Sequence, residues 1–498
     1  MKLRIDVNKL FVNDNSNTSE QAVYGSVINM VDYGFKVFIQ LLSTVILARL
    51  LSPDDFGLIS ISMVVLNFIA IFKDAGLSMA TIQKKDINKE VITSLFWINL
   101  SVSLLLGLIV AILAPIISII YGRSELIGIV ICMSLTFFIN GIVIQHVALI
   151  RRKMMFLSLT VANIISQTFS LGISIILALN GFRYWSLVIG TVSSTIVYTV
   201  LILFFCPWIP KKYQKNSESI DYLKTGGYVS GFNLLNYFSR NLDSILIGKF
   251  YGADAVGLYS KAYQIVLFPL VSIREPITAV ALPTLSRVRE NIPLYKQYYR
   301  YFTSIISIIS MPLMVLIYLS AYEIIFYLFG EQWLSMLSVF KILAIAGFMQ
   351  APLAIKGVIM LSSDKSKEYF NVGVINTVIT ILGIVIGSFW SMEGTAIGYT
   401  IAFYLAQIPT FYYIFKVTNL DLVDLIYSMY PSFVASVISF CTTFVIGNYI
   451  VFESVGIGII SKFLLVFISY LLVMLILKDG RKQLSGFKKI ISIIRKKN

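Results

Sequence analysis

Long apolar segments, each about the length needed to cross a bilayer, recur along the chain and constrain its fold more than any other feature. A transmembrane helix needs about 20 predominantly apolar residues. Fourteen such segments cover roughly 22–49, 55–83, 91–119, 126–150, 155–179, 184–207, 222–249, 254–286, 301–320, 335–362, 369–390, 394–415, 428–449 and 455–477. Only 13% of the residues are charged, against about a quarter in soluble domains. The sequence therefore predicts an all-α integral membrane protein with 14 transmembrane helices.

The basic residues of the connecting loops alternate sharply between the two sides of the membrane. One set of loops and termini holds 28 Lys and Arg, and the opposite set holds only Arg49, Arg123, Arg183 and Lys249. Because cytoplasmic loops carry the excess of Lys and Arg, both termini are predicted to be cytoplasmic. Much of the net charge of +15 is explained this way, so it does not indicate nucleic-acid binding. The first 20 residues are polar, so we expect no cleaved signal peptide.

Twelve charged residues lie inside the predicted helices, where each costs about 2.5–3.5 kcal/mol at a helix centre. The bases are Lys36, Lys73, Arg240, Lys261, Arg274, Lys341, Lys356 and Lys462, and the acids are Asp32, Asp74, Asp243 and Glu275. Nine of the twelve fall in the first, second, seventh and eighth helices. Internal ion pairs that tie helices together are one interpretation. The excess of bases instead favours an aqueous cavity with a positive field that receives an anion.

The depth of two of these charges agrees with a site near the midplane of the membrane. Asp32 and Lys73 are each about ten residues, or about 15 Å, from the cytoplasmic end of their predicted helices. Lys73 and Asp74 are neighbours that point about 100° apart on a helix, so each needs another partner. Asp32 is a candidate partner for Lys73, and Arg240 can pair with Asp243 within one helix.

The two halves of the chain resemble each other. "LARLLSPDDFGLIS" at 47–60 aligns with "IGKFYGADAVGLYS" at 247–260, and Lys73–Asp74 falls on Arg274–Glu275. Each repeat holds six helices, so we expect two lobes of the same orientation, related by a pseudo-two-fold axis along the membrane normal. The predicted organisation is an N-terminal lobe (1–210), a C-terminal lobe (211–420) and two additional helices with a basic tail (421–498). A binding site is expected between the lobes.

Two stretches resemble a known family of transporters. They are "ILARLLSPDDFGLISISMVVLNFIAIFKDAGLSMATIQKKD" and "GFNLLNYFSRNLDSILIGKFYGADAVGLYSKAYQIVLFPL", and "GEQW" at 330–333 fits the same pattern. The chain resembles bacterial polysaccharide and O-antigen flippases, in the branch similar to colanic-acid exporters. These belong to the multidrug/oligosaccharidyl-lipid/polysaccharide transporter superfamily. The resemblance implies two six-helix lobes in the bacterial cytoplasmic membrane that open alternately to each side.

The resemblance also implies the substrate: an undecaprenyl-diphosphate-linked oligosaccharide moved from the cytoplasmic to the outer face. The residues expected to bind the diphosphate and sugars are Lys36, Lys73, Arg240, Arg274, Lys261, Tyr33, Tyr237, Tyr263 and Asn67. Asp32, Asp74, Asp243 and Glu275 are expected to orient the bases or carry a coupling proton or Na⁺. No other cofactor is expected. The expected partners are the lipid-linked oligosaccharide, membrane lipids and other polysaccharide-assembly proteins, and no nucleic acid.

Three other functions are open. A cation-coupled multidrug extruder of the same superfamily is the nearest, although cationic drugs favour an acidic cavity and the excess here is basic. A membrane enzyme of glycan polymerisation is less favoured, because no catalytic set, metal cluster or phosphate-binding glycine loop is evident. A purely structural scaffold does not account for the repeated charges. Cys132, Cys206 and Cys441 lie in apolar runs, so neither a disulfide framework nor a metal site is expected.

Overall fold

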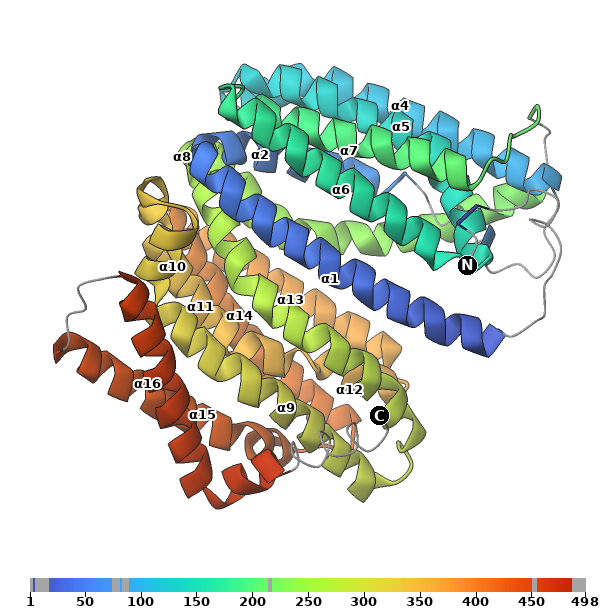
Figure 1. Cartoon of the computed structure of the whole chain (residues 1–498). Coiled ribbons are helices and arrows are strands. Elements are labelled where there is room, and N and C mark those ends of the chain that lie inside the picture. The colour runs from blue at the N-terminus through green and yellow to red at the C-terminus, as the bar shows by residue number, and fades with distance from the viewer. Residues whose placement is uncertain are drawn as a thin grey trace. The chain divides into compact units, whose positions relative to one another are not determined.

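The structure of the protein is a computed structural model that describes residues 3–4, 18–73, 81–82, 89–213, 217–449 and 455–485 (Figure 1). Within these ranges the regular elements are helices. The first half contains α1 (Thr18–Leu50), α2 (Pro53–Ala70), α4 (Lys89–Tyr121), α5 (Glu125–Arg152), α6 (Phe156–Leu179), α7 (Tyr184–Phe205) and α8 (Ser217–Arg287). The second contains α9 (Ile292–Leu319), α10 (Ala321–Leu328), η2 (Glu331–Met336), α11 (Leu337–Leu353), α12 (Lys356–Ser362), α13 (Ser366–Gly387), α14 (Met392–Val417), α15 (Leu422–Tyr449) and α16 (Val455–Ile476).

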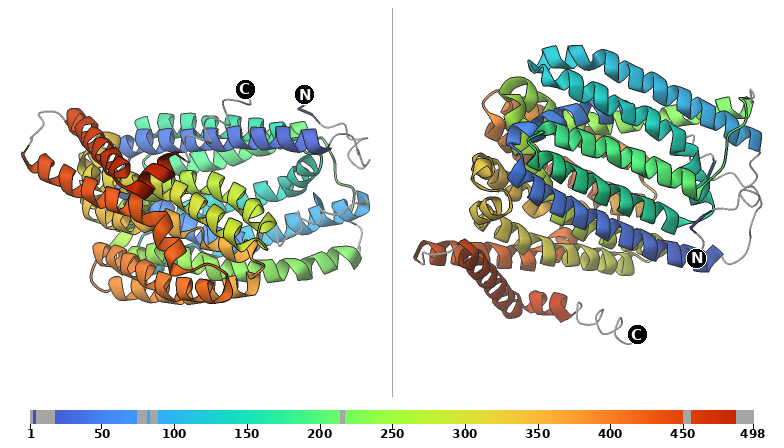
Figure 2. Two further views of the ribbon diagram at one scale, coloured as in Figure 1. Left: turned by 90° about the horizontal axis from the view of Figure 1, so that it is seen from below. Right: turned by 45° about the horizontal axis from the view of Figure 1, so that its top comes forward.

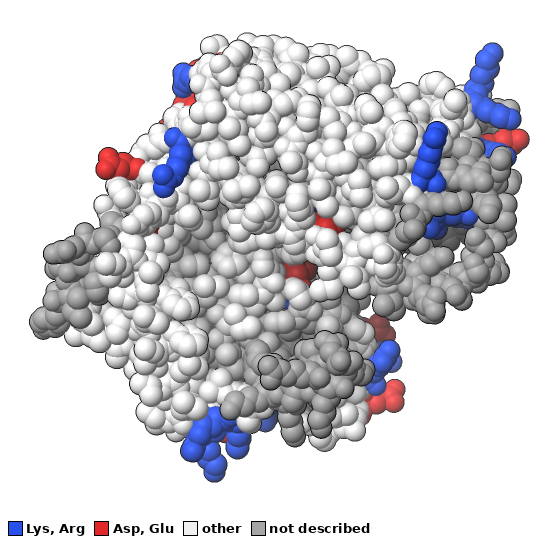
Figure 3. Space-filling view, in the orientation of Figure 1, with Lys and Arg blue, Asp and Glu red and all other residues white. Residues whose placement is uncertain are grey.

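Twelve helical stretches of the described residues are long and apolar enough to cross a membrane. The chain is thus a multi-pass membrane protein. Two predicted spans need comment: 222–249 forms the first part of α8, and 394–415 forms α14, which is not among the twelve. The exact number of 14 spans stays a prediction. Most of the surface shown in Figure 3 is uncharged, as expected for helices surrounded by lipid.

Contacts divide the chain into two compact units, unit 1 (Met1–Gly257) and unit 2 (Leu258–Asn498). In unit 1, α4 packs on α5, α5 on α7, α7 on α6, and α6 on α1, while α2 contacts α4, α5 and α7. Figure 1 shows α4, α5, α6 and α7 side by side. A buried core cluster that includes Phe96, Leu149 and Trp208 closes one end of this layer. The predicted boundary between the two lobes, at residues 210 and 211, stays a prediction.

Unit 2 repeats part of this packing order. Its α9 packs on α11, α11 on α14, and α13 on α14. If α9 is matched to α4, α11 to α5, α13 to α6 and α14 to α7, the same three helix pairs form in both halves. The crossing of α13 and α14 depends on small residues, because a Cβ on Gly383 would lie 2.5 Å from the backbone oxygen of Gly398. This agreement is what an internal repeat requires, and the symmetry axis itself stays a prediction.

Helix α2 begins with a complete capping box. The Ser52 hydroxyl accepts a hydrogen bond from the Asp55 N–H, and the Asp55 carboxylate accepts one from the Ser52 N–H. Arg123, from the turn between α4 and α5, donates to both carboxylate oxygens of Asp54 at 2.6 and 2.8 Å. Because Asp54 and Glu125 both accept from its guanidinium, the pKa of Arg123 is raised. The start of α2 is therefore fixed by ion pairs at the end of unit 1 that the basic-residue bias assigns to the outer face.

Helix α8 is interrupted at Gly252, whose φ of 85° lies in the region that favours glycine. The two predicted spans 222–249 and 254–286 end and begin on either side of this residue, so their boundary is confirmed. Just beyond the break, α8 crosses α2 at very close range. A Cβ on Gly57 would lie 1.7 Å from the backbone oxygen of Ala253, and one on Gly257 would lie 1.9 Å from that of Pro53. Only glycine fits at both positions.

The last two helices, α15 and α16 (Figures 1 and 2), contact the rest of unit 2 at both of their ends. At one end, the buried carboxylate of Asp424 accepts from Arg300 (2.7 Å) and contacts the ammonium of Lys296 at 3.0 Å. At the other, Lys462 of α16 pairs with Glu323 of α10 and donates to the backbone oxygen of Leu319 at 2.9 Å. The Ser304 hydroxyl of α9 also donates to the backbone oxygen of Ser428 of α15 at 2.9 Å. The helices α15 and α16 therefore form one body with α9.

Candidate functional site

The first predicted site group in unit 1 is an ion pair within α1. The Lys36 ammonium lies 2.6 Å from the Asp32 carboxylate, one helical turn away. Asn163 of α6 donates to the other oxygen of the same carboxylate at 3.4 Å. Asp32 is 9% exposed, whereas the Lys36 side chain is 40% exposed. A buried acid thus orients a cation that still reaches the surface of unit 1.

Lys73 is not inside a continuous helix, which corrects the prediction of a span over 55–83. Helix α2 ends at Ala70, and the N–H groups of Ile71, Phe72 and Lys73 each donate to the carbonyl three residues before. Such bonds tighten the last turn of a helix where the α pattern stops. The physical reason is local: the adjacent charges of Lys73 and Asp74 interrupt the apolar sequence. Asp74 lies outside the described residues.

The end of α2 just before Lys73 bears on function as well as on the fold. Irregular backbone at membrane depth is tolerated where it is buried in protein or lines a water-filled cavity. In many transporters, broken helices mark the position of the substrate. Lys73 therefore lies in the type of backbone environment where a binding residue is expected.

The remaining predicted residues of unit 1 are spread over α1, α2 and α8. Tyr33 and Asn67 are both exposed. The Tyr237 hydroxyl donates to the backbone oxygen of Val64, and its ring lies 5.8 Å from that of Phe68. Tyr237 therefore joins α8 to α2 and has a structural contact besides its predicted role.

One acidic and one basic residue of α8, Asp243 and Arg240, complete the predicted set in this unit. Asp243 is buried, and its carboxylate accepts a hydrogen bond from the Ser244 N–H at 2.7 Å. The predicted pairing of Asp243 with Arg240 stays a prediction, because the Arg240 side chain lies outside the described residues.

Arg274 and Glu275 of unit 2 form an ion pair although they are adjacent in the sequence. Neighbours on a helix point about 100° apart, so it is the length of these two side chains that lets them meet. Arg274 is 32% exposed and Glu275 is 54% exposed. The pair therefore lies at the surface of unit 2, where a ligand can reach it.

A run of aromatic and amide side chains connects three helices of unit 2. Tyr259 and Tyr263 of α8 are stacked with ring centroids 6.3 Å apart, and Tyr263 meets the edge of Tyr399 of α14 at 6.0 Å. Gln350 of α11 donates to the Tyr399 hydroxyl at 3.3 Å. Tyrosine rings and amide groups are suited to the apolar faces and hydroxyl groups of sugars. Of these four residues, only Tyr263 was predicted.

Lys356 marks an interrupted helix in unit 2. The predicted span 335–362 is divided into α11 and α12 by a turn at Ala354 and Ile355, and Lys356 follows this turn directly. Its ammonium donates to the amide oxygen of Gln407 at 3.1 Å. Gln407 lies two turns beyond Tyr399 on α14, about 12 Å along the helix axis. Lys356 therefore contacts α14, the helix that also contributes Tyr399 to the aromatic run.

Two further lysines of unit 2 have uncharged contacts in the described residues. Lys261, a predicted site residue, donates to the Gln264 amide oxygen at 3.2 Å. The ammonium of Lys341 lies 5.7 Å from the ring centroid of Tyr318. The contacts described here are thus with an amide group for Lys261 and with an aromatic ring for Lys341.

Lys462 requires a correction to the predicted excess of intramembrane bases. It was counted among the bases without a nearby acid, but Glu323 pairs with it. Glu323 was assigned to a loop, because α10 is too short to give a span signal.

We refer below to Tyr263, Gln350, Tyr399, Lys356 and Gln407 as the polar cluster of unit 2. Gln350, Tyr399 and Gln407 were missed because Gln and Tyr carry no charge, whereas Lys356 was identified as an intramembrane base but not assigned to the site. The signal that could have assigned Lys356 to the site is Pro352, four residues before it, which predicts a break in the helix.

Comparisons with known proteins agree on family and fold. A family model described as "Polysaccharide biosynthesis protein" matches residues 46–338. The chain is 27% identical over 308 residues to the teichuronic acid biosynthesis protein TuaB of Bacillus subtilis, covering 61% of this chain and 63% of TuaB. It is 23% identical over 395 residues to the lipopolysaccharide biosynthesis protein WzxC of Escherichia coli, covering 78% of this chain and 79% of WzxC. The chain thus spans less than two thirds of the length of TuaB.

Solved structures with a similar fold include two kinds of transporter. The lipid II flippase MurJ, in an inward closed conformation, matches with a TM-score of 0.73 at 14% identity, over 91% of this chain and 98% of MurJ. An inward-facing multidrug resistance transporter of the MATE family matches with a TM-score of 0.62 at 16% identity, over 76% of this chain and 94% of that chain. At these identities the likeness concerns the fold.

Proposed function

Because the chain belongs to the polysaccharide biosynthesis protein family, we propose that it is a flippase that moves an undecaprenyl-diphosphate-linked oligosaccharide from the cytoplasmic to the outer face of a bacterial membrane. Its relatives include WzxC and a succinoglycan biosynthesis transport protein of Rhizobium meliloti. They are named for polysaccharide biosynthesis and transport, which supports a transporter rather than an enzyme. The predicted cytoplasmic termini fit the proposed direction.

The observation that carries the proposal is the placement of one lysine just after the end of α2 and of another at the break between α11 and α12. Lys73 follows the end of α2, and Lys356 follows the break between α11 and α12. Lys356 has an amide partner, Gln407. A cation kept inside the membrane with a neutral partner is costly unless it faces water or an anionic ligand. A diphosphate is such a ligand, because Lys is a common phosphate-binding residue.

The polar cluster of unit 2 supplies the groups expected for the sugar part of the substrate. Tyr263 and Tyr399 offer ring faces and edges, while Gln350 and Gln407 offer amide donors and acceptors. In this proposal Lys36, Lys261, Arg240 and Arg274 assist with the diphosphate. Asp32 orients Lys36 and is the candidate to carry a coupling proton or Na⁺, because it is buried and has a polar neighbour in Asn163.

The test is restoration of surface glycan in cells that lack their own exporter. Lys73→Ala, Arg274→Ala and Lys356→Gln should each reduce surface glycan at least tenfold and cause the lipid-linked precursor to accumulate inside. The control is Lys416→Ala, at an exposed position in the last turn of α14, which should export as wild type. Membrane levels of all variants are measured in parallel. Wild-type export by all three site variants would contradict the proposal.

A cation-coupled multidrug extruder is the second candidate, because the MATE transporter shares the fold. Such a protein would raise the tolerated concentration of cationic drugs and leave surface glycan unchanged. Drug tolerance measured in the same cells therefore separates the two functions. We expect no change in tolerance, since the intramembrane charges of this chain are mainly basic.

A further inference from the structure

A groove of about 660 Å³ runs between α13 and α14 of unit 2, which lie side by side (Figure 1). The backbones of these helices almost touch. A Cβ on Gly387 would lie 2.2 Å from the backbone oxygen of Gly394. A Cβ on Gly398 would lie 2.1 Å from the backbone oxygen of Gly383. Because small residues occupy the line of contact, the larger side chains stand on either side of it and leave a groove.

The two ridges that flank the groove are apolar and exposed. Leu382 and Ile386 form the ridge of α13, and Ile397, Ile401 and Leu405 form the ridge of α14. Each of these side chains is 45–55% exposed. Exposed apolar side chains on membrane-spanning helices face lipid, since no water enters the hydrocarbon region. The groove is therefore open to the hydrocarbon chains of the bilayer.

The groove has one polar end. The helices are antiparallel and are joined at residues 388–391, so the lining residues next to this turn share one end. Ser391, Glu393 and the indole of Trp390 lie there, and every other lining residue is aliphatic or glycine. The basic-residue bias assigns this end to the outer face, where an exposed Trp is typical of the membrane interface.

The length of the groove matches a chain from one leaflet. From Glu393 to Leu405 the lining of α14 extends for about 18 Å at 1.5 Å per residue. The hydrocarbon of one leaflet is about 15 Å thick, which is half of the bilayer core. One acyl chain with its head group at the outer surface would therefore occupy the groove along its whole length.

The carboxylate at the polar end has a neutral partner. Ser338 of α11 donates a hydrogen bond to one oxygen of Glu393 at 3.1 Å. In the part of the chain that the structure describes, no Lys or Arg lies within ion-pair distance of this carboxylate. Glu393 is in the first turn of α14, where the helix dipole stabilises an acidic side chain. The groove thus offers an anion to the head group of a lipid.

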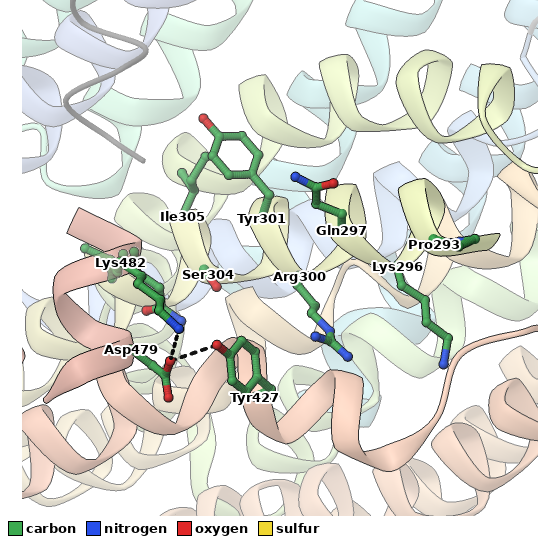
Figure 4. A pocket seen from close by; sticks show the side chains of 12 residues that line it. Pro293, Lys296, Gln297, Arg300, Tyr301, Ser304, Ile305, Tyr427, Asp479 and Lys482 are labelled. Atoms are coloured by element: carbon green, nitrogen blue, oxygen red, sulfur yellow. Dashed lines mark hydrogen bonds and ion pairs between the residues drawn. The ribbon is translucent and has the colours of Figure 1, made fainter. Parts of the chain in front are cut away.

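A second pocket of unit 2, of about 550 Å³ beside α9, shows the opposite situation (Figure 4). Its cations already pair with aspartates: Lys296 and Arg300 with Asp424, and Lys482 with Asp479. Figure 4 shows the contact of Lys482 with Asp479. The charges of that pocket are neutralised within the protein, whereas Glu393 leaves a charge for a ligand.

We propose that the groove between α13 and α14 binds a phospholipid whose head group carries a primary ammonium, such as phosphatidylethanolamine, from the outer leaflet. The ammonium has three N–H donors and gives one to the Glu393 carboxylate, which also keeps its bond from Ser338. One acyl chain lies between the two ridges. Phosphatidylglycerol fits the groove less well, because its head group has no cation. The proposal does not depend on the transported substrate.

The experiment measures the phospholipids that the purified protein retains in native mass spectrometry after release from nanodiscs with equal amounts of phosphatidylethanolamine and phosphatidylglycerol. Glu393→Gln should lower the ratio of retained phosphatidylethanolamine to phosphatidylglycerol about threefold, the effect of one partly exposed ion pair. The matched control is Glu331→Gln, which removes the same charge from an exposed position of η2 outside the groove. It should keep the wild-type ratio. Equal ratios in the two variants would overturn the proposal.

A second pair of variants tests the space rather than the charge. Ile401→Trp should fill the groove from the ridge of α14 and lower the retained phosphatidylethanolamine while Glu393 stays in place. Its control is Ile408→Trp, at a position of the same helix that is 69% exposed and lies outside the lining. Equal retention by these two variants would also overturn the proposal.

Two further measurements separate a phospholipid from other occupants of the groove. Undecaprenyl diphosphate has no ammonium, so it should leave the retained phosphatidylethanolamine in place. Displacement by it would overturn the proposal in favour of a site for the substrate chain. The oligomeric state should be the same in wild type and Ile401→Trp, and a wild-type dimer that becomes a monomer in this variant would overturn the proposal in favour of an interface between copies.

Discussion

Gly57 of α2 and Gly257 of α8 lie against each other's helices in a reciprocal contact. A Cβ on Gly57 would meet the backbone of Ala253, and a Cβ on Gly257 would meet the backbone of Pro53. Positions 53 and 253, like 57 and 257, are equivalent in the predicted repeat. Contacts exchanged in this way are typical of elements related by a two-fold axis.

This crossing should not tolerate one added methyl group. Gly57→Ala places a Cβ 1.7 Å from a backbone oxygen, so the helices must separate, and we expect a loss of about 1–3 kcal/mol of stability. The control is Gly172→Ala on α6, where no atom lies within 4 Å of the new Cβ. Because Ala favours helix over Gly, this control should be neutral or slightly stabilised. Thermal unfolding in detergent measures both, and equal melting temperatures would contradict the geometry.

The buried carboxylate of Asp424 should be essential for the attachment of α15. Asp424→Asn leaves Arg300 and Lys296 without their shared anion, and we expect a loss of about 1.5–3 kcal/mol, as for hydrogen bonds to charged groups. Asp421→Asn is the control, because Asp421 is 53% exposed and exposed ion pairs contribute about 1 kcal/mol or less. Denaturant unfolding should rank Asp424→Asn well below Asp421→Asn. The opposite rank would be incompatible with the observed burial.

The attachment of α16 at the other end should be measurable as a coupling energy. The side chains of Lys462 and Glu323 are largely buried and contact each other directly. Their coupling is measured in a double-mutant cycle of Lys462→Met and Glu323→Gln. Residues in one salt bridge usually couple by about 0.5–3 kcal/mol. Additive effects of the two substitutions on unfolding free energy would show that the pair does not hold α16.

The contact of Asp421 with Lys296 should depend on pH only in acid. The Lys296 ammonium and the Asp424 backbone hold the pKa of Asp421 at about 2, below its unfolded value of about 3.9. A lowered pKa contributes stability above the unfolded value, and this contribution is lost as the pH falls through about 2. The difference in melting temperature between wild type and Asp421→Asn should be constant above about pH 5. A difference that changes between pH 5 and 8 would argue against this assignment.

Some features of the fold could be predicted because they depend on local sequence. Apolar length located the spans, and the gap between the predicted spans 222–249 and 254–286 contains the break in α8 at Gly252. The end of α2 at Ala70 was missed, because hydropathy averages over a helix and does not register where its hydrogen bonds stop. The pairing of Arg274 with Glu275 was not foreseen, since a helical wheel takes no account of side-chain length.

The charged residues of the candidate site were easier to predict than the uncharged ones, of which only Tyr263 in the polar cluster was predicted. Lys36 and Asp32 were identified as isolated charges in an apolar helix, and the structure places them together. Tyr399 and Gln407 of α14 and Gln350 of α11 are uncharged, so only their tertiary contacts identify them. The polar contact of Lys462 with α10 likewise depends on folding, because 139 residues separate it from Glu323.

The attachment of α15 and α16 at both ends has a mechanical consequence for a transporter. A hairpin fixed at only one end could swing aside, but a hairpin fixed at both must be displaced sideways through lipid whenever α9 is reoriented. The hydrodynamic resistance to that displacement is set by the viscosity of the surrounding bilayer. The turnover of such a protein would thus slow in stiff, ordered membranes even if its affinity for cargo were unchanged.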